Sequence, residues 1–258
     1  MKITKIEKKK RLYLVEINQT DKLYVTEDTI VRFMLSKNQT ISPQELEKIK
    51  DFAQFSYGKD LALYHLSFKQ RTEKEVRDYL LEHDIDPKTC SKVISSLKEE
   101  KWLDDAKYTQ NLLDQNLSTG DKGAYLLKQK LHQKGIKQDL YEAIIDQADF
   151  YPLCQKIAQK LLRKYQNKLP NRALKDKIIQ TLCNKGFSFQ EAKMAFDSLV
   201  LEEEEDVQNQ LLDKEFEKQH RKLSRKYDGY DLRQRLTQTL LRKGYDYDAI
   251  KKAVDNNL

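Results

Sequence analysis

The apolar residues of this chain follow the same pattern four times. Each copy has apolar residues eight and four positions before a central residue, and again one, six and ten positions after it. Steps of four place side chains on one face of a helix, so each copy predicts two amphipathic helices joined by a short turn. The central residues are Asp84, Gly135, Gly186 and Gly244.

The residues at these turns support the same interpretation. Gly135, Gly186 and Gly244 suit the left-handed conformation that ends many helices, and Asp84 is a poorer but tolerated substitute. Typical helix starts follow or precede the turns. These predicted caps are Asp86 with Pro87, Ser188 with Glu191, Asp246 alone, and Thr72 with Glu75.

Each unit is longer than two helices. The residues before each pair also carry helical patterns, for example 105–117 and 153–165. We therefore predict a tandem array of three-helix units, which builds an extended surface more readily than a single catalytic pocket. The alternative is four unrelated helical hairpins that share common turn chemistry.

The N-terminal residues do not follow the repeat. Residues 3–8, 11–17 and 22–25 are rich in strand formers and predict a small antiparallel sheet. A short helix is expected over 28–35, and Ser42 with Pro43 and Glu45 predicts the start of a helix that runs toward Tyr57. The predicted domains are a β-containing cap with its helix at 1–56, followed by three-helix repeats at 57–104, 105–150, 151–201 and 202–258.

Composition favours a helical, water-soluble protein. Of the 258 residues, 39% are apolar and 34% charged, and glycine and proline are scarce. No apolar run is long enough to cross a membrane and no leader-like segment follows Met1, so a cytoplasmic protein is expected. Cys90, Cys154 and Cys183 are distant in sequence and fall on or beside apolar stripes, which predicts small core residues rather than disulfides.

The sequence lacks the patterns of a catalytic or metal site. None of His65, His83, His132 and His220 pairs with another ligand at metal-binding spacing. Glycine-rich phosphate loops and nucleophile-elbow motifs are also missing. We therefore expect a non-catalytic protein without a cofactor or metal.

Two local features have structural interpretations. Trp102 is the only tryptophan, and we expect it to pack with Leu103 into the joint between the first two units, with Asp104 or Asp105 capping the next helix. The acidic run 202–206 is interpreted as a solvated helix start or linker.

Basic residues recur at comparable places in the four units, and the net charge is +7. If the units stack with a constant rotation, these residues line up along one side, where they could follow a phosphate backbone or an acidic protein groove. The alternative is that they are only the exposed faces of amphipathic helices. The candidate partner-binding residues are Arg71, Lys74, Arg77, Lys122, Lys128, Lys130, Lys134, Arg172, Lys175, Lys177, Arg233, Arg235, Arg242 and Lys243.

Several segments together resemble a known family. These are Ala62-Leu63-Tyr64-His65-Leu66, Arg71-Thr72-Glu73-Lys74-Glu75-Val76, the Trp102-Leu103-Asp104-Asp105 joint with Tyr108, and the Lys-Gly-apolar turns. They are similar to the signatures of the RecX family, bacterial regulators of the RecA recombinase, and the N-terminal extension and four units match its longer Gram-positive forms. The chain departs from the family pattern at Asp84, where glycine is usual, at Trp102, where the residue is more often small, and at Lys107, where arginine is usual.

The resemblance implies mainly α-helical tandem three-helix bundles, curved and elongated, without catalysis. It implies an inhibitor that binds the RecA filament on single-stranded DNA and limits its growth or stability, and with it ATP hydrolysis, strand exchange and co-protease activity. Direct DNA binding and action as a monomer away from membranes are expected as well. Two alternatives remain at this stage, a general DNA-binding helical protein with helix-turn-helix-like units and an interaction solenoid for an unrelated partner.

Overall fold

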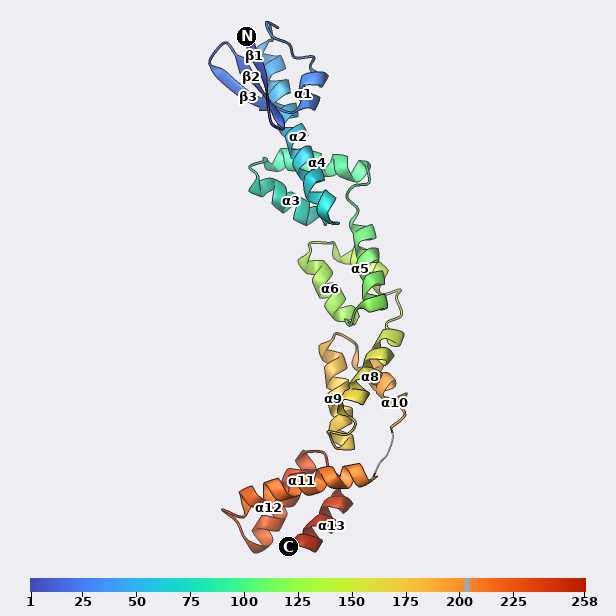
Figure 1. Ribbon diagram of the computed structural model, residues 1–258. Coiled ribbons are helices and arrows are strands. Elements are labelled where there is room, and N and C mark those ends of the chain that lie inside the picture. The colour runs from blue at the N-terminus through green and yellow to red at the C-terminus, as the bar shows by residue number, and fades with distance from the viewer. Residues whose placement is uncertain (202–204) are drawn as a thin grey trace. The chain divides into compact units, whose positions relative to one another are not determined.

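The computed structural model describes residues 1–201 and 205–258 (Figure 1), so residues 202–204 of the acidic run lie outside the described part. The described residues form a three-stranded sheet and otherwise helices. The strands are β1 (Ile3–Lys9), β2 (Leu12–Ile17) and β3 (Asp21–Val25). The helices are α1 (Glu27–Arg32), α2 (Pro43–Phe68), α3 (Glu73–Glu82), α4 (Pro87–Glu99), α5 (Asp105–Thr119), α6 (Ala124–Gln133), α7 (Gln138–Ile145), α8 (Tyr151–Tyr165), α9 (Asn171–Asn184), α10 (Phe189–Asp197), α11 (Glu205–Leu223), α12 (Gly229–Arg242) and α13 (Tyr247–Asn257).

The mainly helical class, the small sheet and the three-helix organisation are confirmed. By packing, the chain divides into two compact units, and the division does not follow the predicted repeats. Unit 1 comprises Met1–Leu112 and Lys130–Ile144, and unit 2 comprises Leu113–Gln129 and Ile145–Leu258. The predicted repeat boundaries remain a proposal, and one of them, between residues 56 and 57, falls inside the continuous helix α2.

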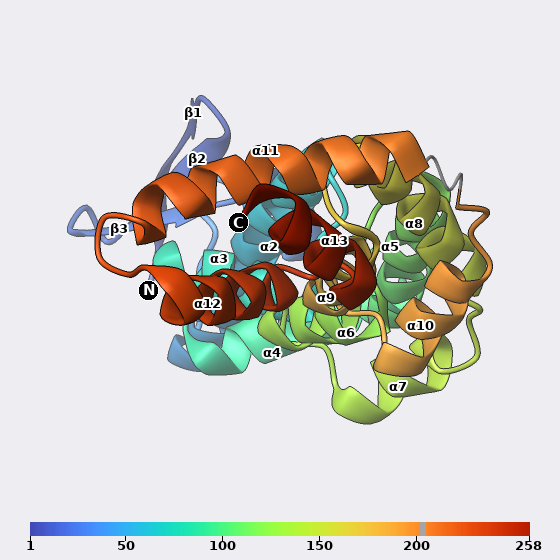
Figure 2. The same ribbon diagram turned by 90° about the horizontal axis from the view of Figure 1, so that it is seen from below.

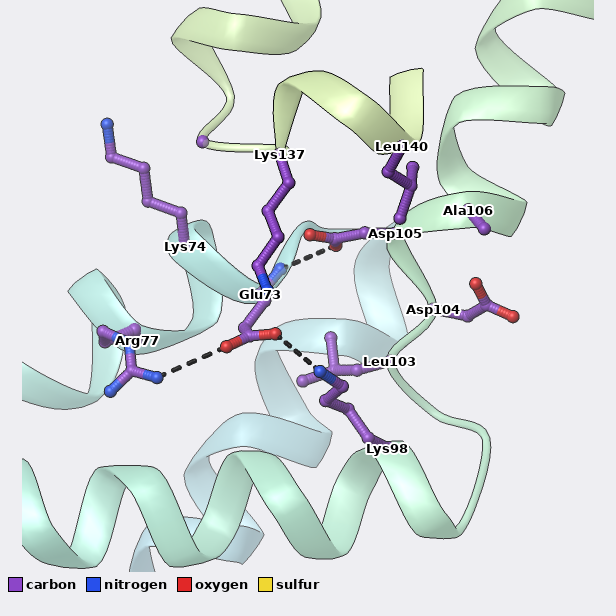
Figure 3. Close-up of a pocket in the computed structure, with 11 residues that line it drawn as sticks. Glu73, Lys74, Arg77, Lys98, Leu103, Asp104, Asp105, Ala106, Lys137 and Leu140 are labelled. Carbon is purple, nitrogen blue, oxygen red and sulfur yellow. Dashed lines mark hydrogen bonds and ion pairs between the residues drawn. The ribbon is translucent and has the colours of Figure 1, made fainter. Parts of the chain in front are cut away.

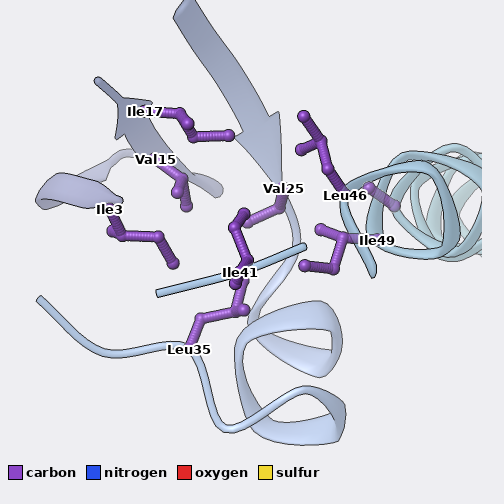
Figure 4. Packing of buried hydrophobic residues seen from close by; sticks show 9 residues of the cluster. Ile3, Val15, Ile17, Val25, Leu35, Ile41, Leu46 and Ile49 are labelled. Carbon is purple, nitrogen blue, oxygen red and sulfur yellow. The ribbon is translucent and has the colours of Figure 1, made fainter. Parts of the chain in front are cut away.

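The sheet lies at the start of unit 1. Its strands are antiparallel in the order β1-β2-β3, close to the predicted ranges. Alternate residues of β2 face the helices, and Val15 and Ile17 pack with Leu46 and Ile49 of α2 in a buried cluster (Figure 4). Helix α2 starts at the predicted capping box of Ser42 and Glu45 and continues to Phe68, well beyond the predicted end.

Helix α2 also serves the second core of unit 1. Its C-terminal half packs on α3 and α4, and Ala62 is buried there with Val76, Leu80 and Val93. Truncating the fully buried side chain of Leu80 to alanine would typically cost about 2–5 kcal/mol. Because one continuous helix belongs to both cores, the cap and the first three-helix bundle cannot be separated at residue 56 without cutting it.

Unit 2 contains two further helix triplets. Helices α8, α9 and α10 pack together, and α11, α12 and α13 lie side by side in Figure 2. Leu236 and Leu240 of α12, fully buried with Ile250, occupy the positions that the repeat predicts for a core stripe. No helix among the described residues is long and apolar enough to cross a membrane.

The turns adopt the predicted conformations. The backbone φ is +59° at Asp84, +77° at Gly135, +90° at Gly186 and +91° at Gly244. The predicted capping boxes at Thr72 and Ser188 and the caps at Asp86 and Asp246 are present as well. Cys90 and Cys154 are buried, Cys183 is half-buried and all three are free; burial raises the pKa of Cys154 to about 12, which keeps it a thiol.

Candidate partner interface

The turn of one repeat lies against the start of a helix in the preceding repeat. In unit 1, the hydroxyl of Thr72, the N-cap of α3, donates a 2.8 Å hydrogen bond to the carbonyl of Lys134 at the C-terminal end of α6. In unit 2, the N–H of Gly123 donates to the carbonyl of Lys185 at 2.8 Å, and the N–H of Tyr125 donates to the carbonyl of Gly186 at 3.1 Å. Helix ends leave carbonyls and N–H groups unpaired, and these contacts satisfy both ends at once.

Aligned helix dipoles favour the same contacts. The carbonyl end of α6 meets the N–H end of α3, and the carbonyl end of α9 meets the N–H end of α6, so opposite partial charges face each other in each case. The lysine before each of these glycines adds an ion pair, Lys134 with Glu75 and Lys185 with Asp121. These two lysines therefore join repeats.

Lys243, the lysine before Gly244, makes its ion pair inside its own repeat. Lys243 pairs at 3.2 Å with Glu215 of α11, in its own helix triplet. Gly244 still approaches the start of α9, because a Cβ built on it would lie 2.8 Å from the backbone nitrogen of Ala173. The close approach of the turn to the preceding repeat thus recurs, but the ion pair between repeats does not.

Three other candidate cations pair within their own repeat. Lys128 lies 2.6 Å from Asp146, Lys175 lies 3.8 Å from Asp197, and Arg233 lies 3.4 Å from Asp255. Each aspartate stands at the same place after its glycine and reaches from the third helix of the repeat to the second. The recurrence of this aspartate can be read from the sequence, but its pairing with the second helix depends on the fold. Such surface pairs contribute only about 0–1 kcal/mol each, but they neutralise the cations.

Basic residues of the first two repeats line a pocket in unit 1 (Figure 3). Its lining includes Lys74, Arg77, Lys98 and Lys137. Glu73 lies among them and accepts hydrogen bonds from Arg77 at 3.4 Å and Lys98 at 3.0 Å. Arg77 is therefore partly neutralised. The ammonium of Lys74 has no ion-pair partner among the described residues, while its stem packs against Gly135.

Asp105 closes one side of this pocket. Its carboxylate accepts a 3.0 Å hydrogen bond from the backbone N–H of Glu73, the first residue of α3. Burial raises the pKa of the Asp105 carboxyl, and the hydrogen bond from Glu73 opposes that shift. Asp104 accepts from the N–H of Lys107 at 2.9 Å and caps α5. The predicted cap is thus confirmed at Asp104, and Asp105 serves a different helix start.

The prediction for Trp102 was wrong. Leu103 is buried as expected, but 59% of Trp102 is exposed. Directly before Trp102, Lys101 adopts a left-handed φ of +63° just past the end of α4, and in this turn Leu103 is buried while Trp102 stays at the surface.

Apart from Lys130, the candidate cations thus fall into two groups. Arg71 pairs with Glu75 at 3.9 Å. The paired group consists of the candidate cations that make an ion pair: Arg71, Arg77, Lys128, Lys134, Lys175, Arg233 and Lys243. Lys130 also has an interaction with another residue. The cations that make no ion pair within 4 Å in the described part of the chain are Lys74, Lys122, Arg172, Lys177, Arg235, which stacks on Tyr227 at 4.1 Å, and Arg242. We call these six residues the unpaired cations.

The ion pair of Glu75 with Lys134 makes the stability of unit 1 depend on pH. Burial alone would raise the pKa of Glu75, but hydrogen bonds from Lys134 and from the N–H of Thr72 outweigh it and hold that pKa below its usual value. A carboxyl with a lowered pKa stabilises the fold fully above its ordinary pKa, and this stabilisation is lost as pH falls through the lowered value. We expect Glu75→Gln to reduce the loss of stability between about pH 5 and about pH 3, measured as urea midpoints by circular dichroism.

A matched control is Glu82→Gln. Glu82 is exposed near the end of the same helix and has no ion pair among the described residues. Its replacement should leave the acid dependence of the wild type intact. An equal flattening in both variants would contradict a specific role for Glu75.

Comparison with known proteins agrees with the helical repeats. Models of two domains match, "RecX, first three-helix domain" at residues 59–97 and "RecX, third three-helix domain" at both 147–196 and 206–254. The curated "Regulatory protein RecX" of Streptococcus mutans is 62% identical over 98% of both chains. The chain belongs to the RecX family. The "Regulatory protein RecX" of Streptococcus sanguinis is 60% identical over the same shares.

Solved structures of RecX proteins show the same fold. One, titled "Crystal structure of regulatory protein RecX", is 28% identical and has a TM-score of 0.63 over 76% of this chain and 99% of the other. RecX from Lactobacillus salivarius is 29% identical, with a TM-score of 0.54 over 57% of this chain and 98% of the other. The third-domain model matches twice in succession, so both the third and the fourth helix triplets resemble this domain of the family.

Proposed function

We propose that this RecX protein is a non-catalytic inhibitor of RecA that binds the RecA filament on single-stranded DNA in the cytoplasm. It limits the growth or stability of the filament and so lowers its ATPase, strand-exchange and co-protease activities. The observation that carries the proposal is similarity over 98% of the chain to proteins named regulatory protein RecX. The names of these relatives state a regulatory role, and we assign RecA as the protein that this chain regulates.

The repeats support a polymeric partner. Unpaired cations occur in each of the helix triplets, at Lys74, Lys122, Arg172 and Arg235 for example. A filament presents the same surface many times, so several weak contacts from successive repeats add up without a deep pocket. We expect a monomer to suffice for this mode of binding.

The direct test is the DNA-dependent ATPase of preformed RecA filaments, measured with the full-length chain. We expect inhibition at equimolar or lower ratios to RecA, together with co-sedimentation of the protein with the filaments. Unchanged ATPase activity at every ratio would remove the basis of the proposal. Tight, strongly salt-dependent binding to duplex DNA without RecA, in the absence of inhibition, would instead favour the general DNA-binding alternative.

A further inference from the structure

A groove opens on unit 1 beside the middle of α2, which passes from the core of the sheet to the core of the first bundle (Figure 1). Three phenyl rings line it, Phe33 at the end of α1 and Phe52 and Phe55 of α2. Phe33 packs against the core of the sheet and Phe55 against that of the bundle, and all three rings are only half-buried. We call this feature the phenyl groove.

The rings of the phenyl groove are arranged around a hollow and do not form a flat surface. Phe33 meets Phe52 edge to face, with ring centroids 5.8 Å apart, and Phe52 and Phe55 are tilted by 40° at 5.9 Å. The guanidinium of Arg32 lies over Phe52, 4.3 Å from its centroid. A hollow with an apolar lining accepts an aliphatic or aromatic side chain better than the flat face of a base.

Further apolar surface adjoins the lining residues along the chain. Val31 and Met34 stand directly before Arg32 and after Phe33, and they are 68% and 83% exposed. Single exposed apolar residues are common, but here they lie next to an apolar groove and enlarge the surface that a partner can cover.

Positive charge surrounds the phenyl groove. Arg32, Lys48 of α2 and Lys92 of α4 belong to its lining, and none of them makes an ion pair within 4 Å among the described residues. Asp51 is the acidic residue of the lining. Three cations against one carboxylate leave an excess of positive charge, which attracts an acidic partner.

We propose that the phenyl groove binds an acidic peptide segment of a partner protein. One aromatic or aliphatic side chain of the segment lies between the rings, and its carboxylates lie near Arg32, Lys48 and Lys92. The apolar hollow and the cations around it match the two parts of such a segment. A nucleic acid would match the cations but has no side chain that fills the hollow. Lys48 and Lys92 are not among the candidate filament-binding residues, so the proposal does not rest on the proposed function.

The test is the fluorescence anisotropy of a labelled synthetic peptide, Glu-Asp-Glu-Phe-Leu-Asp-Glu-Asp, titrated with the full-length protein at low salt. We expect binding that weakens roughly tenfold or more when alanine replaces the phenylalanine and leucine of the peptide, because the apolar contact is lost. Lys48→Gln with Lys92→Gln should weaken binding roughly fivefold, and Asp51→Asn should strengthen it about twofold, since one variant removes attraction and the other removes repulsion. A gain of affinity cannot come from a damaged fold.

The control is Lys22→Gln with Lys107→Gln, which has the same net charge as the Lys48 and Lys92 variant. Both lysines are exposed in unit 1, make no ion pair within 4 Å among the described residues and lie outside the phenyl groove, so the affinity should stay as in the wild type. The proposal is overturned if the wild type does not bind the peptide, if the alanine peptide binds equally well, or if both double variants lose the same affinity. Displacement of the peptide by an oligothymidylate as effectively as by unlabelled peptide would assign the surface to nucleic acid and overturn it too.

Discussion

Gly186→Ala is expected to destabilise the contact between α9 and α6 by about 2–4 kcal/mol. A Cβ at residue 186 would lie 2.7 Å from the backbone nitrogen of Leu126 and 2.9 Å from its Cγ, and the φ of +90° is strained for any other residue. The backbone of α6 cannot move aside without losing the hydrogen bond from the N–H of Tyr125 to Gly186. Hydrogen exchange at the amides of Gly123 and Tyr125 measures the loss directly.

The chain offers a control that separates crowding from backbone strain. Gly229 also has a positive φ, +48°, but a Cβ added there meets nothing within 4 Å. Gly229→Ala should therefore cost only about 1 kcal/mol or less, from the strain of the left-handed conformation. If Gly186→Ala costs no more than Gly229→Ala, the close approach of the two helix ends contributes nothing to stability.

Gly123 lies on the other side of this contact and is crowded by Gly186. It is buried and not in the left-handed region, so its own conformation places no demand on the residue type. A Cβ on it would lie 2.3 Å from the carbonyl carbon of Gly186, a distance at which one backbone has to shift. Glycine at 123 is thus explained by the neighbouring repeat alone.

This contact marks the limit of what the sequence could predict. The left-handed turn at Gly186 and the capping box at Ser188 follow from local chemistry, and the structure confirms both. That the turn at Gly186 meets Gly123 and Leu126 depends on packing between segments far apart in the chain. The turns that were predicted to join two helices inside each repeat therefore also form contacts between repeats.

For the candidate interface residues too, one part could be predicted from the sequence and another depends on the fold. Basic side chains recur at comparable positions in the sequence, and that recurrence led to the candidate residues. Whether Lys134 or Lys185 is available to a partner depends on Glu75 and Asp121, which belong to other segments. Tyr64 belongs to one of the segments that resemble the family, and Phe68 to no motif. An apolar residue on an amphipathic helix is usually buried, so the exposure of 47% of Tyr64 and 66% of Phe68 could be known only from the fold.

The division into paired and unpaired cations predicts which residues bind the filament. We expect the triple variant Lys122→Gln, Arg172→Gln and Lys177→Gln to lower the affinity for RecA filaments roughly tenfold, or about 1.4 kcal/mol in binding free energy. These three side chains are exposed and make no ion pair within 4 Å in the described part of unit 2. Their charged groups can reach a partner without first breaking an ion pair.

The comparison is with a second triple variant of the same net charge, Lys128→Gln, Lys175→Gln and Arg233→Gln. These residues also lie in unit 2, but each is held by an aspartate of its own repeat. Their loss should weaken filament binding by about threefold or less, because at physiological salt charges act over a Debye length of about 8 Å and the paired groups are turned toward their aspartates. Co-sedimentation across a range of protein concentrations gives both affinities. Equal losses in the two variants would mean that binding follows net charge alone, and that the unpaired cations make no specific contacts with the filament.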